Sequence, residues 1–274
     1  IWGRAGLGTV TTTGDFAGIV DRAIERAYHE IADAHPFLWL RAAPPGVFRT
    51  TDDITTGTIS VTVGSTAATL SSAPAASVAD REIIITGWNE VYRISAHTAG
   101  GAGITLDSAF NGTTNATASY VIFQREYDLD SDVKEIIVMH VMDPGGVIEQ
   151  ADEAELLRNA DALPSALWPP TKFARIGQQR IRLEGYPDRT RRVEYAHTVI
   201  PADIVDGATI LVPRNFRYVI ADGGLYWTYI ARPDDRADAA GILYASGTQK
   251  MIDADKRNRV TLGRVSGRRA ALYV

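Results

Sequence analysis

The chain has 274 residues, of which 45% are hydrophobic and 22% charged, and this ordinary globular composition excludes a disordered or collagen-like chain. The formal net charge is -5, so a general affinity of the surface for nucleic acid or anionic lipid is not expected. The sequence has no cysteine, which excludes disulfides, thiolate metal sites and cysteine nucleophiles. No apolar run approaches the roughly 18 residues of a membrane-spanning helix, and we expect a soluble protein.

The first element in chain order is an amphipathic helix, predicted over Asp15–Ala34. Its apolar residues recur at intervals of three or four, as one buried face of a helix requires. Pro36 disfavours the α conformation at the residue before it and therefore ends the helix. The bulky apolar residues 37–40 follow directly, and we expect them to anchor the helix end in a core.

Residues 51–124 differ in composition, because Thr, Ser, Ala and Gly alternate there with short β-branched runs and turn residues. The pattern predicts a small β-barrel or sandwich with roughly five or six strands. The candidate strands are 58–63, 82–86, 91–96, 104–106 and 119–123. A tolerated insertion enters and leaves at adjacent surface points, so we expect the two ends of this module to lie close together.

Residues 133–141 are predicted to form a buried strand. Three later segments, 172–176, 180–184 and 191–199, alternate apolar residues with Arg or Glu. Turn residues separate these segments, which favours an antiparallel β meander with one solvated face. We expect the arginines of the meander to face water.

The last third of the chain is predicted to form a helical hairpin that starts at Pro213 and turns at Pro233. Gly223 and Gly224 weaken its first helix, so we expect them to permit the close approach of another backbone. The apolar faces of the hairpin carry the residues to which we assign subunit packing: Phe216, Ile220, Trp227, Tyr244 and Met251.

The C-terminal segment 256–274 is strongly basic. It contains six basic residues and no acidic one, so the net charge of -5 leaves -11 on the rest of the chain. Its apolar residues are too scattered to build a core, and we expect residues 257–274 to form an extended arm. Within it, residues 260–262 and 270–274 have the β-prone character of a strand that adds to a sheet edge.

Motifs of common enzyme classes are absent from the sequence. The histidines at positions 29, 35, 97, 140 and 197 do not have the spacing of a metal site, and there is no nucleophile elbow or phosphate-binding loop. We therefore expect no catalytic residue, no metal ion and no cofactor. Acidic residues are numerous, however, and the sequence cannot show whether two of them face each other across a cleft.

The order of the elements resembles that of the head-to-tail adaptor (connector) proteins of tailed bacteriophages. The stretches that carry the resemblance are 24–40 with its closing aromatic-Trp-Leu, 127–133 and 213–251. In the last stretch, the proline start and the paired glycines fall where the adaptor hairpin has its proline and its small residues. The chain departs from the pattern at Gly223-Gly224-Leu225, where such hairpins more often continue with Ala, and in continuing past Met251.

These patterns and the resemblance imply an α+β fold. A helical body, made of the N-terminal helix and the C-terminal helical hairpin, would carry an inserted small β-barrel or sandwich module, a β meander and an extended C-terminal arm. The corresponding domains are 1–50 with 125–256 for the body, 51–124 for the β module and 257–274 for the arm.

The resemblance also implies a structural virion protein without a catalytic site. Such a protein assembles in the host cytoplasm and forms a ring of about twelve subunits beneath the portal, joining capsid to tail and leaving a channel for DNA ejection. Its partners would be the portal protein, tail or neck proteins, and double-stranded DNA that passes without specific binding, with no membrane. The acidic body fits a channel that does not hold the duplex.

The basic arm is assigned to the contact with the portal. The residues expected to bind there are Arg257, Arg259, Arg264, Arg268 and Arg269.

Two other classes of protein stay open. A tail-associated module for receptor or glycan binding could use Trp88, Tyr92 and Phe110 as a stacking surface, and a wall-degrading virion hydrolase would need an acidic pair in a groove.

Overall fold

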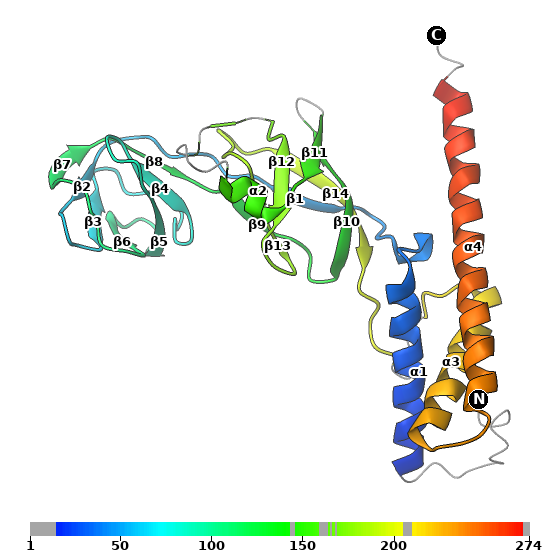
Figure 1. The fold of residues 1–274 in the computed structure, drawn as a ribbon. Coiled ribbons are helices and arrows are strands. Elements are labelled where there is room, and N and C mark those ends of the chain that lie inside the picture. The colour runs from blue at the N-terminus through cyan, green and yellow to red at the C-terminus, as the bar shows by residue number, and fades with distance from the viewer. Residues whose placement is uncertain are drawn as a thin grey trace. The chain divides into compact units, whose positions relative to one another are not determined.

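The computed structural model describes the backbone of residues 15–142, 146–158, 164, 166–167, 169–204 and 210–270, and the side chains of all of these except 15–17, 157–158 and 260–270. The chain divides into two compact units. The helical unit consists of Ile1–Ala42 and Thr198–Val274, and the β unit of Ala43–His197. Figure 1 labels the helices and strands of both units.

Three long helices form the helical unit: α1 (Asp15–Ala34), α3 (Arg217–Ala231) and α4 (Ala237–Ala270) (Figure 1). Short 3-10 helices lie at Leu38–Leu40 and Arg214–Phe216. The helix α3 packs against both α1 and α4. The predicted bounds of α1 and the hairpin of α3 and α4 are confirmed. Among the described helices, none is long and apolar enough to cross a membrane.

Gly223 explains how α3 fits between its neighbours. A Cβ atom at this position would lie 2.6 Å from Cβ of Ala27 on α1 and 2.7 Å from a ring carbon of Tyr244 on α4. Such distances leave no room for a side chain, so the predicted close approach at this glycine is confirmed. The surrounding core contains these buried residues: Tyr28, Ile31, Ala32, Phe37, Leu40, Val212, Val219, Ile220 and Met251.

The first sheet of the β unit is formed by one continuous stretch of chain. Its strands are β2 (Ile59–Val61), β3 (Ala67–Leu70), β4 (Glu82–Ile85), β5 (Val91–His97), β6 (Gly103–Leu106), β7 (Asn115–Ala118) and β8 (Tyr120–Phe123). They pair antiparallel in the order β7-β2-β3-β6-β5-β4-β8. The end strands β7 and β8 are consecutive in the chain, so the sheet curls into a nearly closed, barrel-like form around an apolar core.

The second sheet of the β unit is assembled from distant segments. Its strands are β1 (Gly46–Arg49), β9 (Glu126–Asp128), β10 (Val133–Val141), β11 (Gly146–Gln150), β12 (Lys172–Arg175), β13 (Arg180–Leu183) and β14 (Arg192–Val199), with the short helix α2 (Glu153–Arg158) after β11. Their order is β1-β14-β10-β11-β12-β13-β9. The end strands meet, because the ring of Phe48 on β1 stacks on that of Tyr127 on β9 with centroids 5.0 Å apart.

The predicted fold class is wrong. The protein is mostly β, with two seven-stranded sheets and four helices in the described residues, and is not a helical body with a small inserted module. The predicted meander is also wrong, because β14 does not neighbour β13. Instead it lies between β10 and β1, which precedes it by more than a hundred residues. Pairing over such a separation leaves no local sequence signal, which is why the second sheet was missed.

The extended C-terminal arm is wrong as well, because α4 continues as a helix through Ala270. Residues 260–262, which were expected to form a strand, are therefore helical. Residues 271–274 lie outside the described part of the chain. The helix α4 starts at Ala237 and runs for 34 residues. The basic segment has weak apolar patterning, but it continues a helix that has already formed. Adding turns to an existing helix costs less free energy than starting a new one, so the segment is helical.

The division into units differs from the predicted domains. The strands of residues 125–197, assigned above to the helical body, belong to the same compact unit as residues 51–124. The two ends of the 51–124 segment do lie together, as expected. Thr51 Oγ1 donates a hydrogen bond to Gln124 Oε1 at 3.2 Å, and the backbone N–H of Ile54 donates to the carbonyl of Ile122 at 2.8 Å.

Candidate functional site

A groove between α1 and α3 is centred on Trp227. The indole Nε1 of Trp227 donates a hydrogen bond to Glu30 Oε2 at 2.8 Å, and the Arg26 guanidinium lies over the indole ring, 3.3 Å from its centroid. Arg26 Nε also donates to Glu30 Oε1 at 3.0 Å. This arrangement holds the indole in one orientation with part of its surface exposed.

The groove is mainly apolar and has a volume of about 350 Å³. Its lining residues are Ile19, Arg22, Ala23, Arg26, Trp227, Ile230 and Ala231. The Ile230 side chain is 50% exposed at its rim. Arg22 and Arg26 are the charged residues of this lining, and Glu30 balances the charge of Arg26, so Arg22 gives the apolar groove its positive charge.

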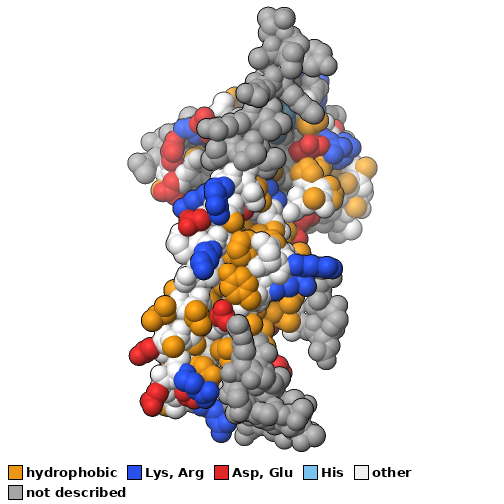
Figure 2. Space-filling model, turned by 90° about the vertical axis from the view of Figure 1, so that its right-hand side faces the viewer, with side chains coloured by type: hydrophobic (Ala, Val, Ile, Leu, Met, Phe, Trp, Pro, Cys, Tyr) orange, Lys and Arg blue, Asp and Glu red, His pale blue; other side chains and the backbone are white. Residues whose placement is uncertain are grey.

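A second apolar surface lies on α4. Ile242 and Leu243 are 70% and 59% exposed, although both are large aliphatic residues. Asp235 and Asp238 are exposed on the turns that precede them. Figure 2 shows a face of the molecule that includes α4, where hydrophobic side chains gather between charged ones. We call Asp235, Asp238, Ile242 and Leu243 the α4 surface.

The residues predicted for subunit packing all lie in the helical unit. Ile220 and Met251 are buried, whereas Phe216 and Tyr244 are partly buried against the same core. Trp227 is also only partly buried, and it lines the groove instead of that core. The Tyr244 hydroxyl donates to the carbonyl of Ala27 at 3.2 Å, and burial, followed by the nearby Glu30 carboxylate, raises its pKa.

The arginines predicted to bind the portal all lie on α4, but their environments differ. Arg257 is exposed. Arg259 Nε donates to Asp255 Oδ2 at 2.8 Å, and the same buried carboxylate accepts hydrogen bonds from the backbone N–H of Leu38 at 2.8 Å and from His35 Nε2 at 3.0 Å. Asp255 thus ties α4 to the chain after α1, and Arg259 Nη2 also donates to the carbonyl of Pro36. The side chains of Arg264, Arg268 and Arg269 lie outside the described residues.

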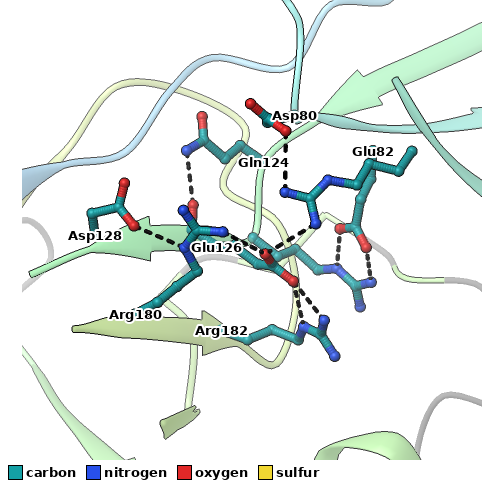
Figure 3. A network of polar contacts seen from close by, with 9 residues as sticks. Asp80, Glu82, Gln124, Glu126, Asp128, Arg180 and Arg182 are labelled. Carbon is teal, nitrogen blue, oxygen red and sulfur yellow. Dashed lines mark hydrogen bonds and ion pairs between the residues drawn. The ribbon is translucent and has the colours of Figure 1, made fainter. Parts of the chain in front are cut away.

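A network of ion pairs joins the two sheets of the β unit (Figure 3). Arg125, between β8 and β9, makes a two-bond pair with Glu82 on β4, with Nε to Oε2 at 2.6 Å and Nη2 to Oε1 at 2.5 Å. The two side chains are only 13% and 17% exposed. Such a partly buried pair has a fixed geometry and is costly to break.

Glu126 on β9 lies at the centre of this network (Figure 3). Its Oε1 accepts hydrogen bonds from Nη2 and Nε of Arg182 at 2.5 and 3.2 Å. Its Oε2 lies 3.8 Å from Nη1 of Arg93 on β5 and 3.8 Å from Nη1 of Arg180. The expectation that the arginines of these strands face water is therefore wrong for Arg182, which is paired within the unit.

Sequence reasoning missed the network because its acids and arginines come from separate strands. The alternation of Arg with apolar residues at 180–183 was visible, but the acids that face them lie at 126–128. A cavity of about 180 Å³ adjoins the network and is lined by its charged residues. The charged residues that line it are paired with one another, so the network cross-links the two sheets.

The aromatic stacking surface considered for a binding module does not form. Tyr92 and Phe110 are 0% and 1% exposed and belong to the core of the first sheet. The rings of Trp88 and Phe110 meet edge to face with centroids 5.2 Å apart. Tyr92 and Phe110 therefore pack the barrel interior, and Trp88 is partly buried against the same core, so the three rings do not form one exposed surface.

Comparison with known proteins does not assign the chain to a family. No family model matches the sequence, and no relative is found among the curated proteins. The groove, the α4 surface and the ion-pair network are therefore the features from which a function can be proposed.

Proposed function

We propose that the protein is a structural virion protein, a head-to-tail adaptor that forms a ring beneath the portal of a tailed bacteriophage. It joins capsid to tail and leaves a channel through which DNA passes. No catalytic residue or cofactor takes part in this function. The resemblance of 24–40 and 213–251 to adaptor helices supports the proposal, since both segments form helices that pack together.

The observation that carries the proposal is that one small unit exposes two different apolar surfaces. A ring needs a heterologous contact, in which one patch of a subunit binds a different patch of the next. The groove between α1 and α3 is concave and apolar, and Ile242 and Leu243 project from α4 as large exposed side chains. Insertion of these side chains into the groove of a neighbouring copy buries both surfaces.

Charge favours the same pairing. Arg22 and Arg26 line the groove, Arg26 being already paired with Glu30, and Asp235 and Asp238 precede the exposed aliphatic residues of the α4 surface. Opposite charges around an apolar centre steer two surfaces into register and disfavour like-to-like contacts. Two copies that met through the same surface would place equal charges together, so the charge pattern favours a head-to-tail arrangement.

The partners of the ring follow from its place in the virion. The portal and the tail or neck proteins bind its two ends, and double-stranded DNA passes without specific binding. Among the arginines assigned to the portal contact, Arg257 is exposed on α4, where its Nε donates to the carbonyl of Asp253 at 3.3 Å. Arg259 has a different role, because its guanidinium is engaged by Asp255 within the helical unit.

Negative-stain electron microscopy of the purified full chain tests the proposal. We expect closed rings with a central channel, accompanied by a single large species in native mass spectrometry. Trimers would favour a tail-fibre type of binding module instead. Particles of monomer size at every concentration up to the solubility limit would contradict a ring-forming adaptor.

A further inference from the structure

A histidine and two carboxylates meet on the helical unit, and none of the three lines the groove. Glu25 and His29 lie four residues apart on α1, and Asp203 lies in the segment that follows β14. One ligand atom from each residue lies within 4.8 Å of the other two. His29 Nε2 and Asp203 Oδ1 are already in contact at 3.2 Å.

The helix geometry explains how two of these groups come together. Residues four apart on an α-helix lie on the same face, so Glu25 and His29 project side by side. Asp203 then approaches from a different part of the chain. A ligand held by all three groups would therefore connect α1 to the segment after β14, and both belong to the helical unit.

The charge balance of the cluster points to a cation. Two carboxylates lie around one imidazole, and like charges at this separation repel each other. Within the described part of the chain, the Glu25 carboxylate has no hydrogen bond or ion pair. The nearest arginines on α1 are directed elsewhere, since Arg26 Nε donates to Glu30 and Arg22 Nε to the carbonyl of Gly18.

We propose that Glu25, His29 and Asp203 bind one divalent transition-metal ion, and that Zn²⁺ fits them best. An imidazole nitrogen with carboxylate oxygens is a donor set that Zn²⁺ accepts in tetrahedral coordination. Three protein ligands leave the fourth position to water, which can reach the site because the His29 and Asp203 side chains are 33% and 74% exposed. Ca²⁺ and Mg²⁺ fit less well, because they require more ligands, all of them oxygen.

The bound ion has a structural role. It offsets the repulsion between the two carboxylates and cross-links α1 to Asp203, so it stabilises the folded chain by its binding free energy. Binding requires deprotonated ligands and therefore weakens as the solution becomes acidic. This role does not depend on the proposed adaptor function.

Isothermal titration of the full chain with Zn²⁺, and with Co²⁺ followed by visible absorption, tests the site. We expect saturable binding of one ion per chain and a rise in the melting temperature with Zn²⁺ concentration. His29→Ala should abolish binding, and Asp203→Asn and Glu25→Gln should each weaken it by about tenfold or more. His140→Ala, which alters a partly exposed histidine on β10, is the matched control and should bind as the unchanged protein does.

Two results would overturn the proposal. One is the absence of saturable Zn²⁺ binding by a folded, unmodified chain. The other is binding whose affinity is the same in His29→Ala as in His140→Ala, which would place the ion elsewhere. Asp203→Asn keeps the shape of a mostly exposed side chain, so its circular dichroism should match the parent and separate loss of a ligand from loss of the fold.

Discussion

The ion-pair network of the β unit and the α4 surface of the helical unit use charged and apolar residues differently. In the β unit, Arg125 and Arg182 pair with acids inside the molecule at 2.5 Å, and both sheets enclose their own apolar cores. In the helical unit, Ile242 and Leu243 stay exposed on a helix beside a core that is already filled. The comparison teaches that changes in the β unit should act on folding, whereas changes on the α4 surface should act on assembly.

The largest expected effect is a loss of unfolding free energy, and it should be greater for an aromatic residue in a core than for one that lines the groove. Phe173 on β12 is 1% exposed, and Phe173→Ala should lower the free energy of unfolding by about 3–5 kcal/mol because it leaves a cavity. Trp227→Ala removes a partly exposed ring, so it should cost less stability while reducing the mass of the assembly. Urea unfolding followed by circular dichroism measures the first quantity, and light scattering the second. Equal losses of unfolding free energy in Phe173→Ala and Trp227→Ala would contradict the distinction between the two positions.

The next effect concerns the ion pair that joins the two sheets. Arg125→Met leaves the Glu82 carboxylate without its main partner at 17% exposure and should lower the free energy of unfolding by about 2–3 kcal/mol. Adding Glu82→Leu should recover part of this loss, because it removes the unpaired charge.

The matched control for this pair is Arg189→Met. In the parent protein the Arg189 side chain is 62% exposed and is paired with Asp188. An exposed pair is screened by solvent, so this change should alter stability by less than about 0.5 kcal/mol. If Arg125→Met and Arg189→Met had the same stability, the network would be a surface feature without a joining role.

A smaller effect depends on pH. Burial raises the pKa of Tyr127 to about 12, whereas a tyrosine in an unfolded chain titrates near pH 10. The unfolded state therefore loses its phenolic proton first, and the stability is complete below about pH 10 and falls as the pH rises through about 12.

Tyr127→Phe cannot titrate, so its stability should fall by about 2 kcal/mol less than that of the parent between pH 9 and pH 12. Urea midpoints at the two pH values measure this difference, and the other buried tyrosines affect both proteins equally. Parallel pH profiles for the two proteins would show that the Tyr127 hydroxyl is hydrated in the folded state.

The same two units show how far the sequence alone could predict the structure. The bounds of α1 and the hairpin of α3 and α4 were predictable, because one helix face repeats its apolar residues within a few positions. The strand β10 (Val133–Val141) was predicted with its bounds as well. By contrast, the pairing of β1 with β14 depends on chain segments that meet only in the folded protein.

The functional features follow the same division. The packing roles of Ile220 and Met251 were visible as helical periodicity, but the pairing of Arg182 with Glu126 and of Arg259 with Asp255 was not predicted. The partner of Arg182 lies on a distant strand, and Asp255 is positioned by the chain after α1. A sequence reports which residues are apolar on one face, but it does not report which opposite charge a given arginine will meet.

The central claim is that the α4 surface joins copies of the chain. The most direct test is to measure the molar mass in solution of two variants, Leu243→Asp and Val63→Asp, and to compare them with the parent. The two side chains are matched, at 59% and 56% exposed, and neither change should alter stability by more than about 0.5 kcal/mol. The account predicts that the parent and Val63→Asp form the same large oligomer, whereas Leu243→Asp is a folded monomer. An oligomer of unchanged mass in Leu243→Asp, or a parent protein that is itself monomeric, would contradict it.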